Sequence, residues 1–122
     1  MKSLLIAILI SVASVNVCAE TREWTTEEKL WGATAGVLLA ADWATTRNMT
    51  HRYNEGYYER NPLLSRQPSA NAVNLYFLAV TPAVFLAADY FSDYRKEILQ
   101  ATSLIELIMV GNNLRIGLKF QF

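Results

Sequence analysis

The hydrophobic positions of this chain fall into long uncharged runs separated by short charged segments, a pattern typical of helices rather than strands. The longest run, residues 70–88, contains 19 residues without a charge. Residues 30–41 form a second run, and a third helix is expected over about 94–110, with Glu106 in its second half. A membrane-crossing helix needs ~20 apolar residues. Only the run 70–88 approaches that length by itself.

The expected helix boundaries carry local signals. Thr25 and Glu28 have the spacing of a capping box, so the first helix is predicted to begin there and to end near Thr50. Ser69 suits the N-cap of the second helix. Pro82 lies inside that helix, where it removes one backbone donor and predicts a bend.

The end of the chain changes its pattern. The third helix is expected to stop near Val110, at a polar turn formed by residues 111–113. Residues 114–122 then alternate apolar and polar side chains with the period of a strand. We expect a short strand or an extended tail that lies on the helices or on a membrane surface.

The beginning of the chain has the features of an export signal. Lys2 precedes an uncharged stretch that ends in small residues before residue 20. This predicts a cleaved signal peptide over residues 1–19 and a single helical membrane domain over residues 20–122. Lipid attachment at Cys18 and an uncleaved anchor are the two alternatives.

Composition agrees with a membrane location. Hydrophobic residues make up 52% of the chain and charged residues 18%, against roughly 25% charged residues in ordinary soluble domains. The 11 basic and 11 acidic residues cancel, so there is no basic surplus to hold nucleic acid. The prediction is an all-α protein with three short transmembrane helices after the signal segment, and with the lipid bilayer as its partner.

Charge placement predicts an orientation. With three spans, the first long connection and the tail would lie in the cytoplasm of a bacterium, on the inner face of its inner membrane. Those segments hold six basic residues against four on the outer side, in the direction of the positive-inside rule. The inner six are Arg47, Arg52, Arg60, Arg66, Arg115 and Lys119.

Small side chains form a stripe along the first helix. Gly32, Gly36, Ala40 and Ala44 are spaced four residues apart and therefore share one face. Small residues let helix backbones approach closely in a membrane. The stripe is either a homodimer seam or an internal packing surface against the other helices of this chain, and we favour internal packing.

Each predicted helix carries one acid within or at the end of its apolar run. Residues 37–43 and 84–90 nearly repeat each other and place Asp42 and Asp89 at equivalent positions, while Glu106 lies in the third helix. Acids in apolar segments are costly unless paired, protonated or close to water. A proton, a cation or a small polar passage is one interpretation.

The plainer interpretation pairs each acid with a neighbour. Asp42 would pair with Arg47, and Asp89 with Arg95 or Lys96. Glu106 would hydrogen bond to its own helix face. We favour this structural role because acids are tolerated near the ends of spans.

The connection after the first helix is rich in charged and aromatic residues. His51, Glu55 and Glu59 are four residues apart, as metal ligands on one helix face would be. Gly56 interrupts such a helix and the chain has a single histidine, so no metal is predicted. Asn61 followed by proline predicts a structural turn.

Asp42 and the following Thr45-Thr46, with residues 57–64 (Tyr-Tyr-Glu-Arg-Asn-Pro-Leu-Leu), resemble a pattern in small bacterial membrane proteins, some of them prophage-associated. In these, an Asp and Thr pair precedes a Glu-x-Asn-Pro-hydrophobic loop. The resemblance covers roughly the middle third of the chain and implies a helical membrane fold with a structured polar loop. It implies no activity. The candidate polar cluster is Asp42, Thr46, Glu59, Asn61, Asp89 and Glu106.

No catalytic constellation is present in the sequence. There is no plausible Ser-His-Asp arrangement, no phosphate-binding glycine loop and no thiol after signal removal. The expectation is a protein that is not an enzyme and needs no cofactor, with an accessory or interaction role toward a membrane-protein partner or a second copy. The alternatives are a small proton or ion pathway through the three acids, and a soluble periplasmic bundle.

Overall fold

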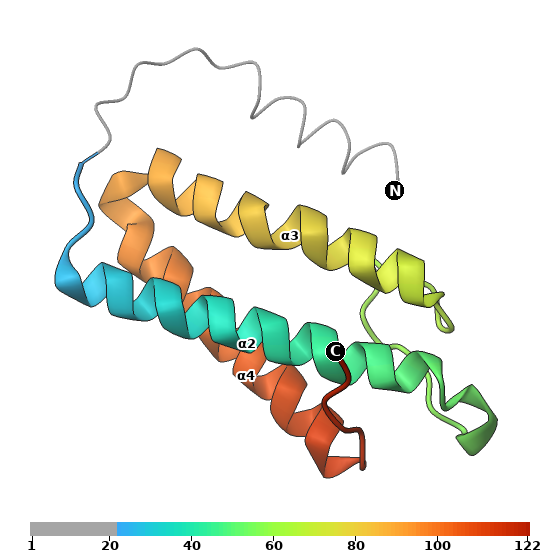
Figure 1. Ribbon diagram of the computed structural model, residues 1–122. Helices are drawn as coiled ribbons and strands as arrows, with labels where there is room; N and C mark the ends of the chain where they lie inside the picture. Colours follow the sequence, from blue (N-terminus) through green and yellow to red (C-terminus); the bar gives the residue numbers. More distant parts are fainter. Residues whose placement is uncertain (1–21) are drawn as a thin grey trace.

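The computed structural model describes residues 22–122, so the predicted signal peptide and Cys18 lie outside the described residues. Within that range the chain forms three α-helices joined by a loop and a tight turn (Figure 1). The elements are α2 (Thr26–Thr50), η1 (Tyr53–Glu55), α3 (Ala70–Tyr90), η2 (Ser92–Tyr94) and α4 (Arg95–Arg115). The predicted all-α class is confirmed for the described residues.

The helix starts follow their local signals. The Thr25 hydroxyl accepts from the Glu28 backbone N–H at 3.2 Å, and the Glu28 carboxylate accepts from the Thr25 N–H at 2.8 Å. This is the predicted capping box. The Ser69 hydroxyl accepts from the Ala72 N–H at 3.1 Å, so α3 also begins where the sequence indicates.

The end of α4 differs from the prediction. The helix continues through the expected turn at residues 111–113 and stops at Arg115. The residue that ends it is Gly117, which has φ +96°. The Leu118 N–H bonds the Asn113 carbonyl and the Gly117 N–H bonds the Leu114 carbonyl, the pair of bonds that defines a Schellman motif.

The last residues lie extended along α2 and contain no strand. Leu118 is buried. The Lys119 N–H donates to the Asn48 side-chain oxygen at 3.0 Å, and the Gln121 N–H donates to the Ala44 carbonyl at 3.1 Å. The tail therefore covers the second half of α2, as the tail interpretation of the sequence expects.

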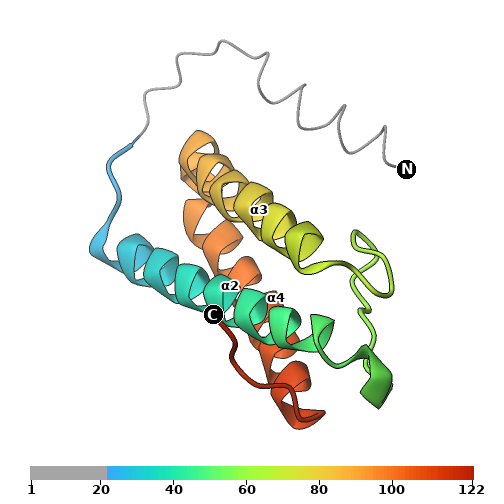
Figure 2. The same cartoon turned by 45° about the vertical axis from the view of Figure 1, so that its right-hand side comes forward.

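The three helices pack side by side, with α2 in contact with both others and most extensively with α4 (Figures 1 and 2). The buried core is small and lies in two clusters. Ala35, Ala88 and Leu99 form one, next to Trp24, Trp31 and Phe85. Leu39, Val73 and Phe77 form the other, next to Trp43, Tyr76 and Val80.

The small-residue stripe of α2 faces parts of the same chain. A Cβ on Gly32 would lie 3.1 Å from the Trp24 ring and 3.5 Å from the Phe85 ring of α3. One on Gly36 would lie 3.8 Å from Phe85. The carbonyl of Ala44, at the other end of the stripe, accepts the hydrogen bond from the tail. These contacts agree with the internal-packing interpretation.

Among the described helices, α3 is the one that is long and apolar enough to cross a membrane. Most of it is not buried inside the bundle. The structure therefore gives one candidate membrane span where the sequence-based expectation has three.

Candidate functional site

A cluster of polar side chains lies between α2 and α4. At its centre is Asp42, which is only 6% exposed. One Asp42 carboxylate oxygen accepts from the Thr46 hydroxyl at 3.3 Å and from the Asn113 amide at 3.0 Å. The expected ion pair between Asp42 and Arg47 is not formed, and the Arg47 guanidinium instead lies 5.2 Å from the centre of the Trp43 ring.

Glu106 reaches the same place from α4. Its carboxyl group lies near the Asp42 carboxyl, close enough for the charge of each to act on the other. The Glu106 Oε2 atom is buried and receives no hydrogen bond from residues 22–122, so the expected hydrogen bond that this oxygen would accept from its own helix face is absent. Two neighbouring carboxylates repel each other, so such a pair is less costly when one of them carries a proton.

Asn113 is the residue that joins the two helices. Its amide nitrogen donates to the Asp42 carboxylate and also to the Thr45 hydroxyl at 2.9 Å. Thr45 is fully buried. Asn113 was expected in a turn, so its role as a bridge between the two helices was missed.

The loop makes a hydrogen bond to Tyr76 of α3. The Asn61 amide donates to the Tyr76 hydroxyl at 2.9 Å. Glu59 folds back on its own loop, where its carboxylate accepts from the N–H groups of Arg60 and Asn61. Tyr76 had no distinguishing signal in the sequence.

Asp89 lies apart from the other acids, at the end of the bundle where α3 turns into α4. It accepts from the Trp24 indole N–H at 3.1 Å and pairs with Arg95 at 3.2 Å. The predicted Asp89–Arg95 pair is confirmed. The three acids therefore do not form one group, since only Asp42 and Glu106 meet.

Arg95 is the centre of this second polar group. Its side chain is fully buried and donates to the backbone carbonyls of Ala88 and Arg22 at 3.1 and 2.9 Å. The guanidinium lies 4.7 Å from the centre of the Trp24 ring. These contacts fasten the segment before α2 to the turn between α3 and α4, a role that the sequence did not indicate.

Glu28 completes the group. It lies within salt-bridge distance of both Arg22 and Arg95 and caps α2. The hydrogen bond from Arg22, with that from the Thr25 backbone N–H, lowers the pKa of the Glu28 carboxyl to about 2. Glu28 is therefore ionised wherever the helix end is intact and the pH is neutral.

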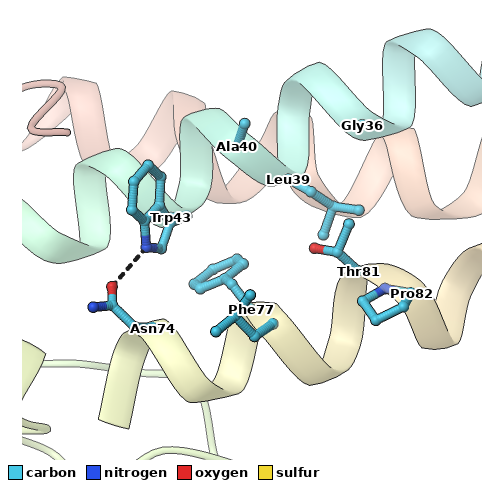
Figure 3. Close-up of a pocket in the computed structure, with 9 residues that line it drawn as sticks. Gly36, Leu39, Ala40, Trp43, Asn74, Phe77, Thr81 and Pro82 are labelled. Carbon is cyan, nitrogen blue, oxygen red and sulfur yellow. Dashed lines mark hydrogen bonds between the residues drawn. The ribbon is translucent and has the colours of Figure 1, made fainter. Parts of the chain in front are cut away.

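A groove of about 580 Å³ separates the middle of α2 from α3. Figure 3 shows Leu39 and Phe77 pointing into it, with Ala40 on the α2 side. The Trp43 indole N–H donates to the Asn74 side chain across one end, at 2.9 Å. The lining is mainly apolar.

No group of three or more His, Cys, Asp or Glu side chains within residues 22–122 is arranged to hold a metal ion. Comparisons of the chain with protein-family models, with curated proteins and with solved structures give no match. The site is therefore interpreted from its own geometry.

Proposed function

We propose that this chain is an integral protein of the bacterial inner membrane, in which α2, α3 and α4 cross the bilayer together, and that it has a non-enzymatic accessory role. The observation that carries the proposal is a charge-poor middle zone with outward-facing apolar side chains, bounded by two charged ends. Helix length supports it, because the 21 residues of α3 or α4 extend about 31 Å and a bilayer core is about 30 Å thick.

The middle zone consists of residues 30–46, 70–88 and 98–114, in which Asp42 and Glu106 are the only charged side chains. Its outer surface is covered by large hydrophobic residues that are 56–70% exposed. They are Leu30, Val37, Leu75, Leu78, Leu86, Leu104, Ile105, Leu107 and Ile108. Soluble monomers rarely expose contiguous apolar surface of this extent.

The two ends hold the remaining charges. We call residues 22–29 and 89–97 the turn end, and residues 47–69 and 115–122 the loop end. Exposed aromatic side chains lie at both ends, with Tyr94 at the turn end and Tyr58 at the loop end. Aromatic residues at both borders of an apolar zone are typical of membrane proteins. Because α3 packs laterally against α2 and α4, the three helices enter a bilayer together.

The test is carbonate washing of membranes that contain the protein, together with a pair of variants. The unchanged protein should stay in the membrane pellet. Leu78→Lys should lower membrane insertion, since a lysine near the centre of a span costs about 2.5–3.5 kcal/mol. Gln67→Lys, at an exposed position in the loop, is the control and should have little effect.

A soluble bundle gives the opposite result. The protein would then appear in the wash and in an osmotic-shock extract. Leu78→Lys would be harmless, because the side chain is 70% exposed and would already face water. That result would contradict the proposal that the three helices cross the membrane.

The accessory role concerns surfaces that the chain does not cover itself. The glycines of the α2 stripe contact Phe85 of the same chain, which leaves the outer faces of α3 and α4 and the loop for a partner. Crosslinking in native membranes should therefore yield a product larger than the monomer. If crosslinkers placed on α3, on α4 and on the loop all yield only the monomer, the accessory role is contradicted.

The meeting of Asp42 and Glu106 favours a second candidate, a small proton or ion pathway. The candidate now involves this pair and Tyr76, since Asp89 lies at the opposite end of α3 from Tyr76. Proton flux into liposomes that contain the protein should be lost in the double variant Asp42→Asn, Glu106→Gln. Flux that is absent from the unchanged protein, or equal in the variant, would exclude this candidate.

A further inference from the structure

Two arginines of the loop lie against one tyrosine ring. The guanidinium carbon of Arg66 is 4.6 Å, and that of Arg60 is 5.7 Å, from the centre of the Tyr58 ring. The ion pairs found within residues 22–122 involve other basic side chains, so neither arginine has a carboxylate partner there. Two positive charges thus share one ring without a counter-charge.

Hydrogen bonds within the loop support this arrangement of two arginines around the Tyr58 ring. A backbone hydrogen bond of 2.8 Å from the Glu59 N–H to the Arg66 carbonyl joins the two sides of the loop. One oxygen of the Glu59 carboxylate, the acid nearest in sequence, accepts from the N–H groups of Arg60 and Asn61. Among the ion pairs within residues 22–122, none joins Glu59 to Arg60 or Arg66. Tyr58 is 42% exposed, which leaves the ring and both arginines accessible.

Charge is distributed unequally between the two ends of the bundle. The loop end has six basic and two acidic side chains, a net charge of +4, and the turn end has four basic and six acidic, a net charge of −2. A positive surface attracts an anion, and the planar guanidinium fork matches a phosphate group. The same loop exposes Leu63, so an apolar side chain lies in the segment that carries the two arginines.

We propose that Tyr58, Arg60 and Arg66 form a binding site for the headgroup phosphate of an anionic phospholipid. The inference rests on the proposed function, which puts the loop end at the bilayer surface. An anionic lipid supplies the phosphate and also the neighbouring acyl chains that contact the exposed Leu63. The loop then anchors the bundle to one leaflet.

The experiment measures lipid selectivity in vesicles. The purified protein is reconstituted into phosphatidylcholine, and its association with spin-labelled phosphatidylglycerol is compared with that of spin-labelled phosphatidylcholine. We expect a preference for phosphatidylglycerol that falls about fivefold for each arginine removed, and therefore further in Arg60→Gln, Arg66→Gln than in either single variant. Added salt should weaken the preference.

Two variants control for charge and folding. Lys29→Gln, Lys96→Gln removes two positive charges from the turn end and should leave the preference unchanged. Arg60→Lys, Arg66→Lys keeps the charge and should retain at least half of the preference. Equal losses in the loop-end and turn-end glutamine variants, or none in either, would overturn the assignment. Loss of the preference with inorganic phosphate, beyond that caused by sodium chloride of equal ionic strength, would assign the site to free phosphate instead.

Failure of the inference and failure of the proposed function are distinguishable. If the protein resists a carbonate wash of phosphatidylcholine vesicles but shows no preference for phosphatidylglycerol, the lipid site is wrong and the membrane proposal stands. If the protein is washed from neutral vesicles and binds only anionic ones in a salt-sensitive way, the membrane-spanning proposal is wrong and headgroup recognition stands. If it associates with neither, both are wrong.

Discussion

Asn113 shows how one side chain joins two helices. Its amide donates to Asp42 and to Thr45, and both acceptors are buried. In Asn113→Ala these acceptors lose their donor, so the free energy of unfolding in detergent micelles should fall by about 1–3 kcal/mol. Asn112→Ala is the control, because the Asn112 side chain accepts only from nearby Arg115, and it should change stability by about 0.5 kcal/mol or less. Equal effects would contradict the bridging role.

Glu28 gives stability a defined pH dependence. Its pKa of about 2 in the folded protein lies below the usual value near 4.3 in an unfolded chain. Its contribution is therefore complete above about pH 4.5 and is lost as the pH falls toward 2. We expect Glu28→Gln to lower the melting temperature at pH 7, with the difference from the unchanged protein shrinking toward zero near pH 2.

The matched control is Glu27→Gln. The Glu27 side chain is exposed and pairs with Lys96 at 3.3 Å, and exposed pairs contribute little. Its melting temperature should follow that of the unchanged protein at every pH. A Glu28→Gln deficit that persists at pH 2 would show that the loss comes from packing rather than from the ionised carboxylate.

Residue-level prediction succeeded where the sequence neighbourhood decides the contact. Asp89 and Arg95 flank one tight turn, so their pairing was foreseeable. Asp42 and Arg47 are five residues apart on one helix, and such residues do not face each other. One donor to Asp42, Thr46, is four residues away on the same helix. The other donor, Asn113, is 71 positions away in the chain. No local rule gives that pairing.

The end of α4 depends on which glycine adopts a left-handed backbone. Gly111 is helical and a Cβ there would meet nothing within 4 Å, whereas Gly117 has φ +96° and its Cβ would lie 3.1 Å from the Tyr57 hydroxyl. Gly111→Ala should therefore raise the free energy of unfolding by up to about 1 kcal/mol. Gly117→Ala should lower it by about 1 kcal/mol or more. Chemical denaturation of both variants measures the difference, and a loss of stability in Gly111→Ala would contradict the continuous helix.

Helix starts were predictable and this helix end was not, for a physical reason. Thr25 and Ser69 act on backbone groups within three residues, so the signal is local. Either Gly111 or Gly117 has the freedom to end a helix. The helix ends at Gly117 rather than at Gly111 because Leu118 is buried against the bundle and the tail forms hydrogen bonds to α2. Those contacts exist only once the helices have assembled.

At the scale of the whole molecule, the unequal charges of the two ends predict one orientation. Single-cysteine variants Ser65→Cys at the loop end and Glu97→Cys at the turn end, each with Cys18→Ser, report the side of the membrane. An impermeant maleimide should label Glu97→Cys in intact spheroplasts and Ser65→Cys only after lysis. Labelling of both sites before lysis would indicate a periplasmic bundle, and the reverse pattern would indicate the opposite orientation.

Length and hydrophobic pattern gave the number of helices and their approximate extents, but not how the helices meet. The small-residue stripe did not by itself distinguish a second copy from the chain's own helices, because glycines serve both arrangements. The contact of Gly32 with Trp24 and Phe85 depends on where α3 returns after a loop of residues 51–69.

The hydrogen bond between Trp43 and Asn74 makes the fluorescence of Trp43 sensitive to the arrangement of α2 and α3. The indole donor belongs to α2 and the acceptor to α3. The emission wavelength of Trp43 therefore depends on the distance between these two helices. A molecule that entered the groove would separate or enclose this pair. Binding of such a molecule in the groove would therefore change the intrinsic tryptophan fluorescence, and no attached dye would be needed to detect it.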